Sequence, residues 1–129
     1  MATIQLREWY GLAFASGKEL NVDGLTVTHK AVSTSAAPAT IIAAVAEKKH
    51  NVYGMAVTSA GTVKATFYSK VATTNTAIRS FNLIAGVPVV LPVGNNGDEW
   101  FATGTAGALT VGLSAPADVN ITTKTKSEA

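Results

Sequence analysis

Few residues in this chain of 129 could carry out chemistry, because it contains two histidines and no cysteine. A thiol nucleophile or a cysteine metal site is therefore excluded. His29 shares an alternating segment with apolar residues, and no second ligand stands at metal-site spacing from it. We expect His29 to pack in the core or at an interface rather than act as a general base or ligand. His50 follows two lysines in an expected turn, and we expect it to be solvated.

The adjacent carboxylates Asp98 and Glu99 would point to opposite faces of a strand, which does not suit paired acid–base work. Asn96-Gly97 just before them favours a hairpin turn. The glycine-rich stretch 104–112 lacks the lysine of a phosphate-binding loop and predicts a turn. No G-x-S-x-G elbow occurs. We expect no catalytic, cofactor-binding or metal site, and no enzyme.

Aromatic residues offer a different kind of site. Trp9, Tyr10 and Phe14 gather near the N-terminus, and Trp100 stands beside Phe101. These rings could form a sugar-stacking platform, but their neighbours are apolar rather than Asn, Asp or Arg. Packing in a core or an interface is therefore favoured. Our candidate interface residues are Trp9, Tyr10, Phe14 and Trp100.

The elements that must position these residues are predicted to be strands, because apolar residues alternate with period two. One face is expected to carry Val27, His29 and Ala31, and another Tyr53 with Met55. Turn residues recur every 8–12 positions or so, which is typical of a β-sandwich or barrel. The segment 39–50 fits a short helix or a strand with a polar turn, and the strand is favoured. Shared parity predicts a core of Val57, Val63, Phe67, Phe81, Leu83, Val89, Leu91, Leu109, Val111 and Ile121.

Two prolines mark the segment Val87–Val93. Pro88 and Pro92 have the same parity, so their missing N–H donors fall on one side of the strand. We expect this strand to lie at a sheet edge, or to be bulged, on that side. Prolines at such a position also oppose edge-to-edge aggregation of an apolar segment.

Composition limits the partners. Charged residues make up 14% of the chain, against about 25% in an average soluble domain. Mean hydropathy is +0.26 and the net charge is only +2. No basic stripe interleaved with aromatics indicates nucleic-acid binding. Arg7 and Glu8 interrupt any signal-peptide core, and no run reaches the ~20 apolar residues of a membrane span. Either the plentiful Thr, Ser and Asn residues cover the outside, or part of it is buried against partners, and the two can hold together.

We divide the chain into an N-terminal arm or added hairpin (1–24), a β-sandwich domain (25–126) and a polar tail (127–129). The arm differs in character because its aromatic cluster leads into a turn-rich stretch. Length alone predicts one folded domain.

A resemblance to a known family covers about Thr26 to Lys126. Its pattern begins with "S-x-x-x-A-T-I-I-A-A-V-A" and "H-N-V-Y-G-M-A-V". It continues with "S-A-G-T-V-K-A-T-F-Y" and "F-N-L-I-A-G-V-P-V-V-L-P", and closes with "W-F-A-T-G-T-A-G-A-L-T-V-G-L-S-A" and "D-V-N-I-T-T". In this ordered pattern the chain resembles external virion β-sandwich proteins of tailed bacteriophages, of the capsid decoration (cement) or head-fibre type.

This resemblance implies an all-β fold, a jelly-roll-like β-sandwich, and a structural role on the capsid exterior after synthesis in the host cytoplasm. It implies a homotrimer whose partner is the major capsid protein, with no nucleic acid and no membrane. The expected function is capsid decoration. A head-fibre, tail or carbohydrate-binding receptor module remains the alternative, and a small hydrolase on a β scaffold a more distant one.

Overall fold

The computed structural model describes residues 24–35, 37–93 and 98–129. Trp9, Tyr10, Phe14 and all of the expected arm except Gly24 lie outside these residues. The described chain forms strands β1 (Thr26–Val32), β2 (Ala39–Ile42), β3 (Lys49–Ser59), β4 (Val63–Val71), β5 (Thr74–Leu83), β6 (Val89–Leu91), β7 (Phe101–Ala102), β8 (Ala108–Leu113) and β9 (Val119–Glu128).

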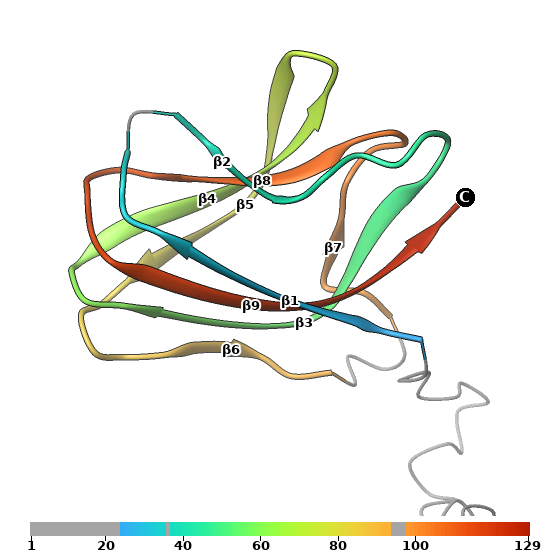
Figure 1. The fold of residues 1–129 in the computed structure, drawn as a ribbon. Coiled ribbons are helices and arrows are strands. Elements are labelled where there is room, and N and C mark those ends of the chain that lie inside the picture. Colours follow the sequence, from blue (N-terminus) through green and yellow to red (C-terminus); the bar gives the residue numbers. More distant parts are fainter. Residues whose placement is uncertain (1–23, 36, 94–97) are drawn as a thin grey trace, which may run out of the picture.

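These strands form two antiparallel sheets packed face to face (Figure 1). One sheet has the order β1-β9-β3-β6, and the other has the order β2-β8-β4-β5. β7 also pairs with β3, at residues 51–52, whereas β6 pairs at residues 55–57. β6 and β7 thus lie end to end along the same edge of β3 and together take the place of one strand. Counted so, the two sheets have the interleaved strand order of an eight-stranded jelly roll, which confirms the predicted all-β sandwich.

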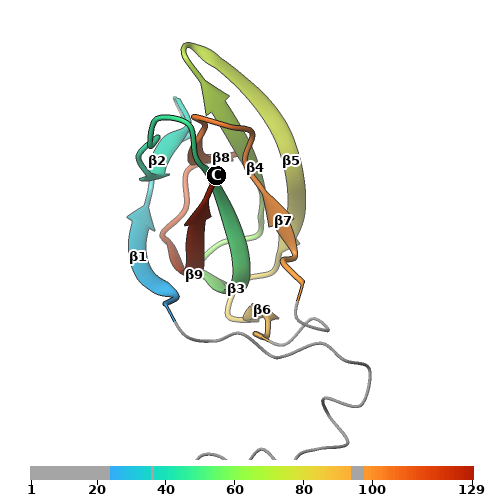
Figure 2. The same cartoon turned by 90° about the vertical axis from the view of Figure 1, so that its right-hand side faces the viewer.

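The core lies between the sheets, and the predicted core residues are there. Seven of the ten are buried, and Phe81, Val89 and Leu91 are partly buried against the others. Phe67 is fully buried, with its ring centroid 5.9 Å from that of Phe81 and 5.8 Å from that of Phe101. Alternation predicted this core because each strand presents one face to the opposite sheet. Figure 2 shows β7, which pairs with the first sheet, beside β5, the last strand of the second sheet.

Of the expected face groupings, one holds but lies on the outer side of its sheet, and another is wrong. In β1, Val27, His29 and Ala31 are exposed, whereas Val32 of the opposite parity is buried. The register with β9 explains this, because Val27 lies opposite the exposed Lys124. The strand therefore has its apolar-looking parity on the outer face.

In β3, a bulge between Val52 and Gly54 shifts the pairing with β9 by one residue. A one-residue shift exchanges the faces of a strand. Val52 consequently joins Met55 and Val57 in the core, and Tyr53 is only half-buried. The predicted grouping of Tyr53 with Met55 is wrong for this reason.

The element boundaries differ at two places. The ambiguous segment 39–50 contains the short strand β2, as favoured, followed by a turn in which Glu47 has a positive φ of 63°. β9 continues to Glu128 and pairs with the start of β3, so most of the expected polar tail 127–129 belongs to the sandwich. Paired backbone hydrogen bonds hold this polar segment without any apolar side chain.

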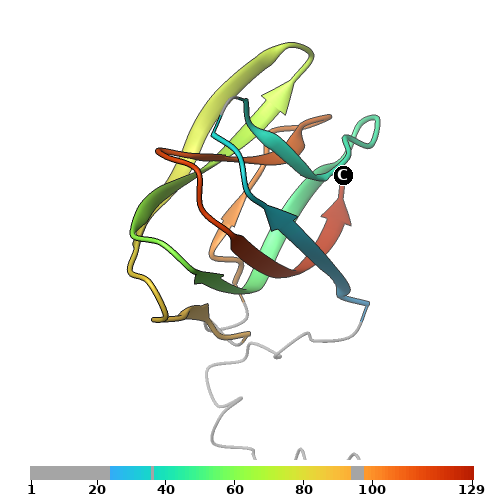
Figure 3. The same ribbon diagram turned by 60° about the vertical axis from the view of Figure 1, so that its left-hand side comes forward.

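β6 lies at the edge of its sheet, and within the described chain it pairs with β3 alone. This confirms the expectation from Pro88 and Pro92. Figure 3 shows β6 below the sandwich, at the side opposite the projecting β4–β5 hairpin. The start of β1 and the end of β6 lie at the same end of the molecule (Figure 1).

Candidate interaction surface

Exposed apolar side chains concentrate along one edge, formed by β6 and the turn before it. Ile84, Val87 and Val90 are 57%, 51% and 58% exposed. A tight turn presents the first two, since the Val87 N–H donates to the Ile84 carbonyl over 3.0 Å. Gly86 makes that turn with a φ of +76°. We call residues 84–93 the β6 edge.

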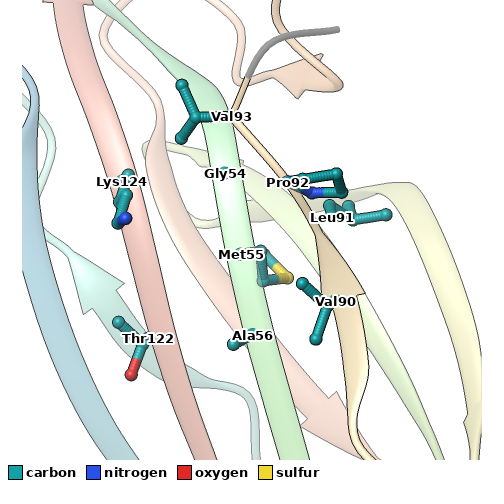
Figure 4. A pocket seen from close by; sticks show the side chains of 9 residues that line it. All are labelled: Gly54, Met55, Ala56, Val90, Leu91, Pro92, Val93, Thr122 and Lys124. Atoms are coloured by element: carbon teal, nitrogen blue, oxygen red, sulfur yellow. The ribbon is translucent and has the colours of Figure 1, made fainter. Parts of the chain in front are cut away.

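A groove of about 120 Å³ adjoins this edge on the outer face of the sheet (Figure 4). Gly54 and Ala56 of β3 form its middle. Figure 4 shows Thr122 and Lys124 of β9 on one side. On the other side lie Val90, Leu91, Pro92 and Val93, with Met55 between β3 and β6.

Gly54 forms the floor of this groove, where a larger side chain would clash with Val93. A Cβ at Gly54 would lie 2.6 Å from Cγ2 of Val93, closer than real Cβ contacts. The glycine therefore lets Val93 lie over the sheet. The result is a shallow apolar surface with a hydroxyl and one ammonium group, those of Thr122 and Lys124, at its far side.

Tyr53, next to Gly54, has a side chain whose pKa is shifted by its surroundings. Its hydroxyl donates to a carboxylate oxygen of Glu128 over 3.3 Å. Burial raises the pKa of Tyr53 above its ordinary value of 10.0, and the negative charge of Glu128 raises it further. Asp98 and Glu99 add smaller electrostatic contributions in the same direction. These two carboxylates thus act at a distance on a tyrosine.

Trp100 fastens the chain beside the β6 edge. Its indole N–H donates to the Pro92 carbonyl over 2.9 Å, and its ring packs partly buried against the core. Phe101 lies in the core itself. A role for Trp100 at an interface stays a prediction. The expected hairpin corner at 96–97 lies outside the described residues, and the flanking strands β6 and β7 pair with β3 rather than with each other.

His50 is the residue that sequence reasoning misplaced most. Expected in solvent, it is 1% exposed, because β3 already begins at Lys49 and turns His50 inward. Nε2 lies 2.8 Å from the Ala43 carbonyl oxygen and must donate to it, so in the neutral ring Nδ1 accepts from the Ser127 hydroxyl at 2.9 Å. The His50 backbone N–H donates to Thr103 Oγ1 over 2.9 Å.

The Ser127–His50 pair has the spacing of a serine nucleophile and its base. The third group, however, is the Ala43 backbone carbonyl, which carries no negative charge to stabilise a protonated ring as the carboxylate of a catalytic triad does. The contacts instead join the β2–β3 turn, β3 and β9. We therefore assign His50 a structural role.

His29 is not in the core, so of its two predicted positions only the interface stays a prediction. It is exposed on β1, with Nδ1 2.9 Å from Thr122 Oγ1. Within the described ranges, no group of three His, Asp or Glu side chains could hold a metal ion. The same residues include no helix with the length and apolar character needed to cross a membrane.

Comparison with known proteins adds no relative. No protein-family model matches the chain, and searches of curated proteins and of solved structures found no significant match. The likeness to phage virion proteins therefore rests on the quoted motifs.

Proposed function

We propose that the protein is a non-enzymatic structural component of a tailed-bacteriophage particle, a homotrimeric decoration protein on the capsid exterior. The observation that carries this proposal is the β6 edge, where three large apolar side chains are more than half exposed. Clustered exposed apolar residues are typical of surfaces that bind a protein partner.

The prolines define how this edge would bind. Pro88 and Pro92 flank β6, and proline cannot donate to a ladder. The prolines therefore oppose pairing of a partner's strand with β6, but they do not oppose burial of the exposed side chains of the edge. The edge suits docking of its valines and isoleucine against a neighbour's surface.

Size argues for more than one contact region. A specific interface buries about 1,000 Å² or more, which a three-residue strand and its turn do not supply alone. The proposal therefore includes residues 1–24 as an attachment arm, with Trp9, Tyr10 and Phe14 as its anchors. β1, which follows this arm in the sequence, starts at the end of the sandwich where β6 finishes (Figure 1).

The mechanism is stabilisation by binding. A protein that binds only the assembled shell stabilises it by mass action, without covalent chemistry. Closed symmetry would place the same loops of each subunit around one axis of a trimer. The low charged fraction, 14%, suits a chain with much of its outside buried.

Two measurements on the full chain test this proposal. Sedimentation velocity is expected to give a trimer, and electron microscopy is expected to show regular added density on empty heads of the phage that encodes it. A stable monomer that leaves such heads bare at high concentration would overturn the proposal.

A further inference from the structure

The second sheet carries a hollow of its own, on the outer face of β2-β8-β4-β5. Its volume is about 190 Å³, and it lies between β4, β8 and the segment leading into β2. Tyr68 of β4 is its one aromatic side chain. Lys64, Thr66 and Ser114 contribute polar groups.

The Tyr68 ring is laid across the neighbouring strand. A Cβ built on Gly112 of β8 would lie 3.2 Å from the ring carbon Cε2 and 3.6 Å from the hydroxyl oxygen. Cγ of Pro38 lies 3.8 Å from the same position. The absent side chain of Gly112 therefore allows the half-buried ring to lie low over the sheet.

Hydroxyl groups around the ring are held in place. The Ser114 hydroxyl oxygen accepts from the Lys64 backbone N–H over 2.8 Å. Thr66 Oγ1 and Ser80 Oγ lie 3.1 Å apart and share a hydrogen bond on the same face. Each hydroxyl has one donor and two acceptor sites, so each keeps capacity for a ligand. Lys64 adds the one ammonium group among the lining residues.

We propose that this hollow binds one ring of an acidic saccharide. The C–H face of a pyranose packs on the electron-rich face of an aromatic ring, and its hydroxyls pair with serine and threonine. The ammonium of Lys64 suits a carboxylate substituent. The hollow is smaller than the roughly 300–1,000 Å³ of sites for drug-sized ligands, so a single ring fits and affinity is weak.

This site goes beyond the proposed decoration function and does not depend on it. The hollow and the β6 edge belong to different sheets, and each lies on its own sheet's outward side. Docking through the β6 edge therefore does not by itself use the residues of the Tyr68 hollow. Several such copies on one particle would bind a polysaccharide by avidity even though each hollow binds weakly.

The alternative use of Tyr68 is structural. An aromatic ring across from a glycine shields the exposed backbone of its own sheet. Such a ring needs no ligand, so binding measurements separate the two roles.

The test is an NMR titration of the isotope-labelled full chain with D-galacturonic acid, using D-galactose as the matched neutral probe. Galacturonate is expected to shift the amide signals of Thr66, Gly112 and Ser114 in a saturable manner, and galactose much less. Tyr68→Ala is expected to abolish the shifts and Tyr68→Phe to retain most of them. Lys64→Gln is expected to reduce the amide shifts caused by galacturonate to the size of those caused by galactose.

Three outcomes would overturn the proposal: no saturable shift with galacturonate, equal shifts with galactose, or shifts that persist in Tyr68→Ala. Tyr53→Phe, which alters a tyrosine of the other sheet, is the control and is expected to bind like the parent. If Tyr68→Ala does not fold, the proposal is tested by the size of the shifts in Lys64→Gln and by whether the shifted signals of the parent belong to residues around the hollow.

Discussion

Replacing His50 with alanine should cost about 2–4 kcal/mol of unfolding free energy. The side chain makes two hydrogen bonds, to the Ala43 carbonyl and the Ser127 hydroxyl. Each has a net value of about 0.5–1.5 kcal/mol. His50 is 1% exposed, so the space left by its ring adds a cavity cost of about 1 kcal/mol. Ala43 and Ser127 are themselves exposed, so water can hydrate their freed polar groups and no further penalty is expected.

His29→Ala is the matched control, because it removes the other histidine of the chain. His29 is exposed and makes one side-chain hydrogen bond, to Thr122. Its loss should cost less than about 0.5 kcal/mol. Urea denaturation at neutral pH gives both values from the midpoint and the slope. Equal losses for the two variants, or a loss below about 0.5 kcal/mol for His50→Ala, would refute the assignment of His50 as a structural residue.

Three further predictions concern the core, the groove and alkaline pH. Phe67→Ala should cost about 3–5 kcal/mol in urea denaturation, because it removes a fully buried ring with two aromatic neighbours. Gly54→Ala should cost about 1–3 kcal/mol in the same assay, because the new methyl group displaces Val93. The folded state raises the pKa of Tyr53 above 10.0, so its contribution to stability is present below pH 10 and lost as pH rises through the folded pKa. Tyr53→Phe should therefore show a shallower loss of stability above pH 10.

A single result would contradict each of these three predictions. Val71 is 44% exposed, and Val71→Ala is the control for Phe67→Ala; similar losses would place Phe67 outside the core. A neutral Gly54→Ala would mean that Val93 does not lie against the glycine. An unchanged alkaline profile in Tyr53→Phe would mean that Tyr53 does not ionise with a raised pKa.

Alternation predicted the sandwich well, because a buried face imposes period two on every strand that crosses the core. The pattern located Phe67, Leu109 and Ile121 in the core without any alignment. The parity of two prolines also located an edge strand, because backbone donors alternate sides as regularly as side chains do.

The failures have equally local causes. A bulge between Val52 and Gly54 reversed the faces of half a strand. The isolated Gly54 within this strand is a residue type that indicates a bulge, and alternation alone does not take it into account. Val27 and His29 lie on the outer face of β1, where alternation alone does not say which parity points inward. His50 was assigned to solvent from its lysine neighbours, whereas its burial depends on Ala43 and Ser127.

The candidate surfaces were only partly foreseeable. The apolar β6 edge follows from the prolines and valines of one segment. The groove beside Gly54 and the hollow beside Gly112 depend on strands far apart in sequence, so only the register of the sheets brings their residues together.

The most direct test of the proposed docking through the β6 edge is cosedimentation of the full chain, as parent, Val90→Asp and Val71→Asp, with empty heads of the tailed phage that the proposed function requires. Both valines are exposed, at 58% and 44%, but only Val90 belongs to the β6 edge. We expect the parent and Val71→Asp to bind saturably, and Val90→Asp to bind at least tenfold more weakly, a change of about 1.4 kcal/mol. Equal binding of the two variants, or no binding by the parent, would contradict docking through the β6 edge.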